Sequence, residues 1–158
     1  ANSNHELLSG LSPKERSRLT PISANMHLVA NRYIKPQTAP HGKSYALMKN
    51  PRGLKINLFI TQAWSDKFKN FVHTLCRALK ESDVLWVCSF ALPQNSTEDM
   101  QELLEKDLRN CAFSAALRHA DSHIVVLDED AVVSTRLWCM YEIHLGSSLQ
   151  KPLLIWPH

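Results

Sequence analysis

Two residues near the C-terminus have the types and the spacing that could serve chemistry on a bound ligand. Trp138 and Glu142 are four residues apart, so on a helix they share one face, one turn from each other. They follow an apolar run at residues 123–127, which is closed by three acidic residues at 128–130. Ligands of open α/β sheets bind beyond the carboxyl ends of the strands, where this carboxylate and this indole would lie. The alternative is that Trp138 belongs to the core and that Glu142 is a solvated surface residue.

Strand-like and helical segments alternate along the chain after residue 53 and would position these side chains. Strands are predicted at residues 54–61, 84–92, 123–127 and 152–156, and helices at 68–80, 99–120 and from the box around Trp138 to about 145. Gly146 is expected to end the last helix as its C-cap. This order predicts an α/β fold, a flavodoxin-like open parallel sheet of about four to five strands with helices on both faces.

The first third of the chain differs in composition from the rest. Residues 1–53 hold five of the eight prolines and eight lysines and arginines against two acids, whereas residues 54–158 hold ten against thirteen. We interpret residues 1–53 as an irregular basic arm, with short helical turns or a strand at 26–33, on a domain of residues 54–158. The arm suits docking on another chain or a solvated extension better than nucleic-acid binding.

Composition excludes several classes of protein. Four glycines are too few and too scattered for a phosphate-binding loop, and no apolar run approaches the roughly 20 residues of a membrane span. The four cysteines show no CxxC spacing, so we expect them reduced and buried, and the eight histidines show no metal-ligand spacing. We expect a cytoplasmic protein, although the basic arm also has the composition of an organelle transit peptide.

Several segments resemble the Toll/interleukin-1 receptor (TIR) domain family. The most specific is the pattern SxxxWCxxEI, formed by Ser134, Trp138, Cys139, Glu142 and Ile143, which is similar to the S-x-W-C-x-x-E-L box of that family. The segments ALRHADSHIVVLDED and INLFITQAW also resemble family segments, with Thr61 where a serine usually stands. The resemblance spans about residues 54–156.

Three features depart from the family's pattern. The usual Arg-Asp-x-x-Pro-Gly loop after the second strand is missing, and the sequence Gln62-Ala63-Trp64 is unusual after the first strand. The given chain also stops after the predicted fourth strand, where the family adds a fifth strand and a helix. A divergent or shortened relative would need a partner or a further segment to cover the open edge of its sheet.

The resemblance implies an activity. Enzymatic members of the family cleave the nicotinamide–ribose bond of NAD, their substrate, and some cyclise the product, with the glutamate that matches Glu142 as the catalytic residue. An ionised carboxylate there would stabilise the oxocarbenium-like ribose that remains when nicotinamide leaves. Nicotinamide is a good leaving group, so the reaction requires no strong general acid, no metal and no further cofactor.

The resemblance also places substrate-binding residues around Glu142. The candidates come from the first loop, the end of the second strand and the box itself: Thr61, Gln62, Trp64, Phe90, Ser134 and Trp138. Trp64, Ser134 and Trp138 also have a structural interpretation. Trp64 would stack on a base or cap the first helix, Ser134 would bind ribose or phosphate or cap its helix, and Trp138 would pin its helix to the sheet. The acids at 128–130 would repel a phosphate, so at least part of that triplet should face solvent.

A second class of function remains open from the sequence. Many TIR relatives are non-catalytic modules that associate with themselves or with partners, and a third reading is a subunit of a larger assembly with residues 1–53 as a strap. The distinguishing feature is the environment of Glu142. An enzyme requires this carboxyl group in an open cavity, whereas an interaction module tolerates it paired or covered.

Overall fold

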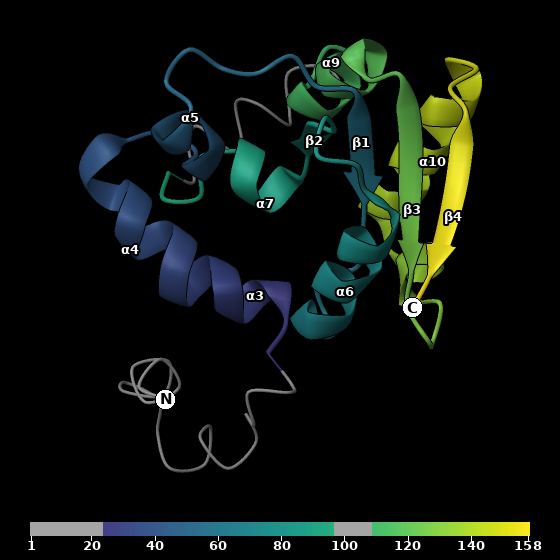
Figure 1. Ribbon diagram of the computed structural model, residues 1–158, viewed down its shortest axis with the longest axis horizontal. Helices are drawn as coiled ribbons and strands as arrows, with labels where there is room; N and C mark the ends of the chain where they lie inside the picture. The colour runs from purple at the N-terminus through teal and green to yellow at the C-terminus, as the bar shows by residue number, and fades with distance from the viewer. Residues whose placement is uncertain (1–23, 97–108) are drawn as a thin grey trace.

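The computed structural model describes residues 24–96 and 109–158, and its centre is a parallel β-sheet with helices on both faces (Figure 1). The strands are β1 (Leu58–Thr61), β2 (Leu85–Trp86), β3 (Ser122–Leu127) and β4 (Leu153–Pro157). Their order is β2-β1-β3-β4, and all three pairings are parallel. The α/β prediction with a flavodoxin-like parallel sheet is therefore confirmed.

The second strand is shorter than its apolar run predicted. Only Leu85–Trp86 pairs with β1, and the chain then turns into a short helix, α7 (Cys88–Ala91). The prediction of a strand throughout residues 84–92 is wrong in its second half, because a short apolar run has no periodicity that separates strand from helix. Of the helix predicted at 99–120, residues 99–108 lie outside the described residues, and the described part contains α9 (Ala112–His119).

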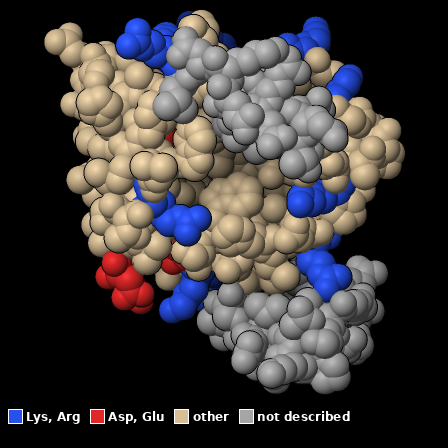
Figure 2. Space-filling view, turned by 180° about the vertical axis from the view of Figure 1, so that it is seen from behind, with Lys and Arg blue, Asp and Glu red and all other residues tan. Residues whose placement is uncertain are grey.

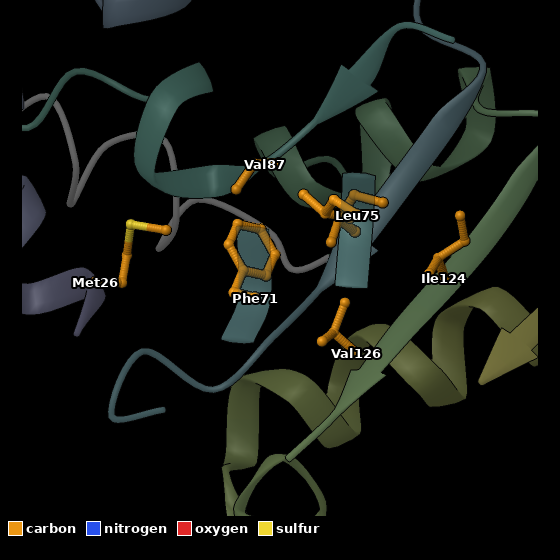
Figure 3. Packing of buried hydrophobic residues seen from close by; sticks show 7 residues of the cluster. Met26, Phe71, Leu75, Val87, Ile124 and Val126 are labelled. Carbon is orange, nitrogen blue, oxygen red and sulfur yellow. The ribbon is translucent and has the colours of Figure 1, made fainter. Parts of the chain in front are cut away.

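Alternate residues of β1 serve the two faces of the sheet, as the pleat of a strand requires. Ile60 faces α6 (Phe68–Ala78) and packs with Phe71 and Leu75 of that helix. Figure 3 shows this cluster between the helix and the strands, together with Met26 from the N-terminal segment.

The opposite face of the sheet carries α9 and α10 (Leu137–Ser148). Phe59 is fully buried there against α9, and its ring stacks on Trp86 with centroids 4.7 Å apart. In Figure 1, α6 lies in front of the sheet and α10 behind it. The chain thus leaves β1 towards one face and β3 towards the other.

The described part of the N-terminal segment is helical. The elements α3 (Met26–Val29), η1 (Ala30–Ile34) and α4 (Lys35–Thr38) follow one another without a break, then come η2 (Ala39–His41) and α5 (Tyr45–Lys49). The middle element is a π-helical turn just before Pro36, which cannot donate the next helical hydrogen bond.

One stripe of this segment packs on the domain. Met26, Ala30, Ile34 and Thr38 recur every four residues and are all buried. Asn95 joins the stripe from outside, because its Nδ2 donates to Thr38 Oγ1 at 2.8 Å. Of the two interpretations of residues 26–33, helical turn or strand, the structure has the helical one.

The last helix continues past Gly146, so the prediction of a glycine C-cap there is wrong. The helix ends at Ser148, and Gln150 adopts the left-handed conformation with φ 54°. The amides of Gln150 and Lys151 donate to Ser147 O at 2.9 Å and Gly146 O at 3.0 Å, which is a Schellman ending with glutamine in the glycine position. Gly146 has a packing role instead, because a Cβ there would lie 2.4 Å from His123 Nδ1.

No helix in residues 24–96 or 109–158 combines the length and the apolar character that crossing a membrane requires.

Candidate functional site

A cavity of about 530 Å³ opens beyond the carboxyl ends of β1 and β2 and beside α10. Its walls come from α3, the segments after β1 and β2, α9 and the first turns of α10: His27, Gln62, Ala63, Trp64, Cys88, Leu92, Gln94, Phe113, Thr135, Arg136, Leu137, Trp138, Cys139 and Glu142. In an open parallel sheet the crevice forms where successive connections leave towards opposite faces, here between β1 and β3. The cavity is of the size that holds a small ligand.

Glu142 lies at the inner end of this cavity, where α10 packs on the sheet. Its side chain is 5% exposed, and its Oε2 accepts a short hydrogen bond from Thr61 Oγ1 at the end of β1. Thr61 Oγ1 also lies 2.8 Å from Nε2 of His123, which sits on β3. Three buried polar side chains therefore form one chain from β3 through β1 to α10.

The direction of hydrogen bonding along this chain follows from Gly146. His123 Nδ1 is buried against the backbone of Gly146 and has no hydrogen-bond partner. Burial lowers the pKa of His123 to about 4, so the ring is neutral at physiological pH and carries one proton. We assign that proton to Nε2, because the unpartnered Nδ1 is then a lone pair and not a buried N–H. His123 donates to Thr61, and Thr61 donates to Glu142.

The carboxyl group of Glu142 holds its proton unusually strongly. Burial raises the pKa of Glu142 to about 8, and the hydrogen bond from Thr61 offsets only part of this effect. Burial also raises the pKa of the Cys88 and Cys139 thiols to about 12, with a smaller contribution from the charge of Glu142. Both thiols in the cavity wall are thus protonated at neutral pH, and neither is a nucleophile.

The outer part of the cavity is aromatic. Trp64 donates its indole N–H to Cys88 Sγ at 3.3 Å, and the ring of His27 meets it edge to face at 5.2 Å. Trp138 is 40% exposed and stacks on Phe113 of α9 with centroids 5.5 Å apart. Trp138 therefore joins α10 to α9, and the interpretation that it pins α10 to the sheet is wrong.

The structural alternative for the Trp138–Glu142 pair is wrong for both residues. Glu142 is buried and Trp138 is half-exposed, whereas the structural alternative had the indole in the core and the carboxylate in solvent. Cys139 in the first turn of α10 packs with Val125 of β3, and Glu142 in the second turn binds Thr61 of β1, whereas Trp138 lies on the side of the first turn that meets α9. The carboxyl group thus lies deeper than the indole.

The structure brings together most of the predicted site residues. Gln62, Trp64, Trp138 and Glu142 line the cavity, and Thr61 joins it through its hydrogen bond to Glu142. Gln62 is 8% exposed, and its amide Nε2 is buried without a hydrogen-bond partner.

Two predicted residues lie elsewhere. Phe90 belongs to α7 and packs in the cluster facing α6, with its ring 5.9 Å from Tyr45. The helical turn of α7 carries it away from the cavity. Ser134 is exposed in the turn η3 (Val132–Thr135), where its hydroxyl donates to Ala131 O at 2.7 Å. It neither lines the cavity nor caps α10, whose N-cap is Arg136.

The acidic triplet after β3 is divided as expected. Asp128 is buried and accepts hydrogen bonds from the amides of Val132 at 2.7 Å and Val133 at 3.0 Å. Glu129 and Asp130 are exposed. The triplet therefore holds the turn that precedes α10 and directs its remaining charge to solvent.

The site residues that sequence reasoning missed include His123, Arg136 and His27. His123 stands inside an apolar strand, and a histidine in such a run is a signal for a buried polar contact. Arg136 lines the mouth of the cavity. It stands between Ser134 and Trp138 in the sequence, so its place within the SxxxWCxxEI pattern was a signal for the site. His27 comes from the N-terminal segment, and no pattern in the sequence connects it with the cavity. The prediction that all cysteines are buried is also wrong, since Cys76 is exposed.

Figure 2 shows the molecule from behind, with a hollow near the middle of this face and several Lys and Arg side chains around it. Within the described ranges, no cluster of three His, Cys, Asp or Glu side chains has an arrangement that could hold a metal ion. Among the described residues that line the cavity, Glu142 is the one acidic residue and Arg136 is the one member of the lysine and arginine class.

Comparisons of the chain with known proteins found no match. No protein-family model matches the chain. No curated protein and no solved structure matches it at a significant level either.

Proposed function

We propose that the protein cleaves the nicotinamide–ribose bond of NAD, with Glu142 as the catalytic residue. The observation that carries the proposal is the position of this single carboxyl group at the inner end of a cavity with aromatic walls. A planar aromatic leaving group fits beside Trp64 and Trp138, and the carboxylate then faces the ribose carbon where positive charge develops. The TIR-like pattern around Glu142 supports the same reaction.

The raised pKa of Glu142 suits a cationic substrate. The nicotinamide ring of NAD carries a positive charge, and a positive charge beside a buried carboxyl group favours its ionised form. Binding would therefore release the proton of Glu142 and generate the carboxylate only when the substrate is in place. As the bond breaks, its electron pair leaves with neutral nicotinamide and the positive charge moves to the ribose, where the carboxylate stabilises it until a water molecule adds and loses a proton to give ADP-ribose. Thr61 holds Oε2 throughout.

The test is nicotinamide release from NAD by the full chain, compared with Glu142→Gln. Glutamine retains the shape and an acceptor for Thr61 but cannot carry the charge, so we expect the rate to fall on the order of 10²–10⁴-fold. Glu81→Gln is the matched control, because Glu81 is exposed on a turn away from the cavity and should leave the rate unchanged. The parent should be measured at high concentration as well, since enzymes of the family that the Trp138–Glu142 pattern resembles generally act as assemblies.

Each outcome is decisive for the role of Glu142. Equal release by the parent and by Glu142→Gln would show that another group performs the reaction. A complete lack of release by the parent, dilute or concentrated, would reject the enzyme proposal. In that case the second candidate, a self-associating interaction module, is favoured by the exposed apolar side chains of β4, among them Leu154 and Ile155.

A further inference from the structure

We infer that the N-terminus of α10 binds the 5′-phosphate groups of a dinucleotide, so that the cavity has an anionic-ligand end and a cationic-ligand end. The identity of the ligand rests on the proposed function, whereas the existence of the anion subsite does not. Three independent features support it: the free end of α10, the side chain of Gln62 and the placement of the two charges.

The N-terminus of α10 lies at the cavity, and its N-cap residue makes no side-chain capping hydrogen bond. The helix has 12 residues, no side chain caps its N-terminus, and no acid stands in its first turn. The first N–H groups of any α-helix lack intrahelical acceptors, and with the helix dipole they favour a bound anion. Residues 135–139 all line the cavity, and Thr135, Arg136 and Leu137 are also exposed to solvent, so this helix end lies at the open rim of the cavity.

Gln62 provides the second feature. Its side chain lines the same cavity and is more than nine-tenths buried, and its Nε2 has no hydrogen-bond partner. A buried donor without an acceptor is destabilising, and native structures rarely keep one without a reason. Nε2 is shielded from solvent, and a rotation of the Gln62 amide would bring it to the cavity, where an oxygen-rich ligand would supply the missing acceptor. Gln62 also contacts the start of α10, because its carbonyl oxygen lies 3.5 Å from Cys139 Sγ.

The charges of the cavity are separated along α10. Arg136 is the N-cap, and Glu142 lies in the second turn. A rise of about 1.5 Å per residue separates the two by roughly 9 Å along the helix axis. This order matches a nicotinamide nucleotide, in which the cationic ring and the anionic phosphates lie on opposite sides of one ribose. A ribose over the first turn would place its ring end at Glu142 and its 5′ end at Arg136.

The experiment measures binding of ADP-ribose and of inorganic pyrophosphate to the full chain by calorimetry, which needs no catalysis. Because hydrogen bonds to charged groups are the strong ones, Arg136→Gln should weaken binding of ADP-ribose about 10- to 100-fold. Arg52→Gln removes the same charge from an exposed turn outside the cavity and should leave binding unchanged. Raising the ionic strength should weaken binding to the parent, although less steeply than for a fully exposed site.

Gln62→Met separates a ligand-binding role from a structural one. Methionine fills a similar volume without a buried donor, so the midpoint of unfolding should stay equal or rise while ADP-ribose binds about tenfold more weakly. A purely structural glutamine would give the opposite pattern, with lower stability and unaltered affinity for ADP-ribose.

The outcomes distinguish this inference from the proposed function. Binding of ADP-ribose that depends on Arg136, without any cleavage of NAD, would retain the anion subsite and reject the hydrolase. Cleavage of NAD with a KM that Arg136→Gln leaves unchanged would retain the hydrolase and reject the subsite. Failure of the parent to bind either pyrophosphate or ADP-ribose at millimolar concentration would also reject it. As an internal check, Arg136→Gln should not change the KM for nicotinamide riboside, which has no phosphate.

Discussion

Polar side chains are buried where β1 and β3 meet α10, whereas apolar side chains are exposed on the outer strand β4. Beneath α10 the protein buries Thr61 from the end of β1, His123 from the start of β3 and Glu142 in one hydrogen-bonded chain. Along β4 it leaves apolar side chains in solvent, with Leu154 44% and Ile155 59% exposed. Buried polar groups and exposed apolar groups both cost stability in an isolated chain.

The two costs have different explanations. The buried chain is fully connected except at His123 Nδ1, and it ends at the carboxyl group that faces the cavity, so its cost belongs to the chemistry of the site. Strand β4 lies at the edge of the sheet within the described residues, and its cost is removed only if another strand or chain covers it. The predictions below test each region in turn.

The largest effect on stability is expected for Gly146→Ala. In most helices alanine would be more stable than glycine by about 1 kcal/mol. Here the new Cβ would lie 2.4 Å from His123 Nδ1, on a histidine that is itself fully buried. Overpacking of this kind costs about 1–3 kcal/mol, so we expect a net loss of stability in urea unfolding, together with displacement of His123 from Thr61.

A double-mutant cycle isolates the contact. His123→Ala removes the ring, so Gly146→Ala in that background should lose its penalty and show the ordinary gain of an alanine in a helix. Ser147→Ala is the control, because Ser147 is exposed on the next position of α10. An additive cycle would mean that the ring and the glycine do not constrain each other.

The next effect is a fall in stability between pH 6.5 and pH 8. The pKa of Glu142 is about 8 in the folded protein, against about 4.5 for an unperturbed glutamate, so the folded state holds the extra proton between these values. Stability therefore decreases as the pH rises through this window, by up to about 1.4 kcal/mol per pH unit. His123, with its pKa lowered to about 4, acts in the opposite direction, but only below pH 6.5.

Urea unfolding at half-unit steps of pH measures this slope. Glu142→Gln should abolish it and should be more stable than the parent at pH 8, whereas Glu81→Gln should preserve it. A parent whose stability stays level or rises between pH 6.5 and pH 8 would show that the carboxyl group of Glu142 is already ionised in the empty cavity.

The sequence was sufficient for the parallel α/β fold because periodicity reports burial directly. The apolar runs of β1 and β3, and the recurrence of Phe71 and Leu75 in α6, are set by which face is buried. Where two conformations bury the same residues, as in the run that contains β2 and α7, the sequence could not choose between them. The predicted end of α10 was wrong for another reason. Glycine stands at position 146 because the ring of His123 leaves no room for a side chain there, and not because the backbone requires it.

From the sequence, only those site residues could be predicted that stand next to a strand end or within the SxxxWCxxEI pattern. Thr61, Gln62, Trp64, Trp138 and Glu142 all belong to segments next to a strand end or to the box, and the rule for parallel sheets brings such segments together. Phe90 failed the rule because a helical turn follows β2 immediately. Arg136 and His27 show the limit, since their place in the cavity depends on the direction of α10 and on the packing of α3.

The smallest effect on stability is expected for Ile155→Lys in β4. Ile155 is 59% exposed, so replacing it with lysine should change the free energy of unfolding by less than about 0.5 kcal/mol. The same change should lower the tendency of the protein to associate, because a lysine on an edge strand opposes pairing with another chain. Light scattering over a range of protein concentrations measures the association.

Leu47→Lys is the matched control, because Leu47 is 44% exposed on α5, which lies on the opposite side of the molecule from β4 (Figure 1). If both variants associate like the parent, the exposed apolar side chains of β4 do not mediate self-association. If only Ile155→Lys stays monomeric while nicotinamide release also falls, the edge and the cavity depend on each other, and the exposed strand is then part of how the site becomes active.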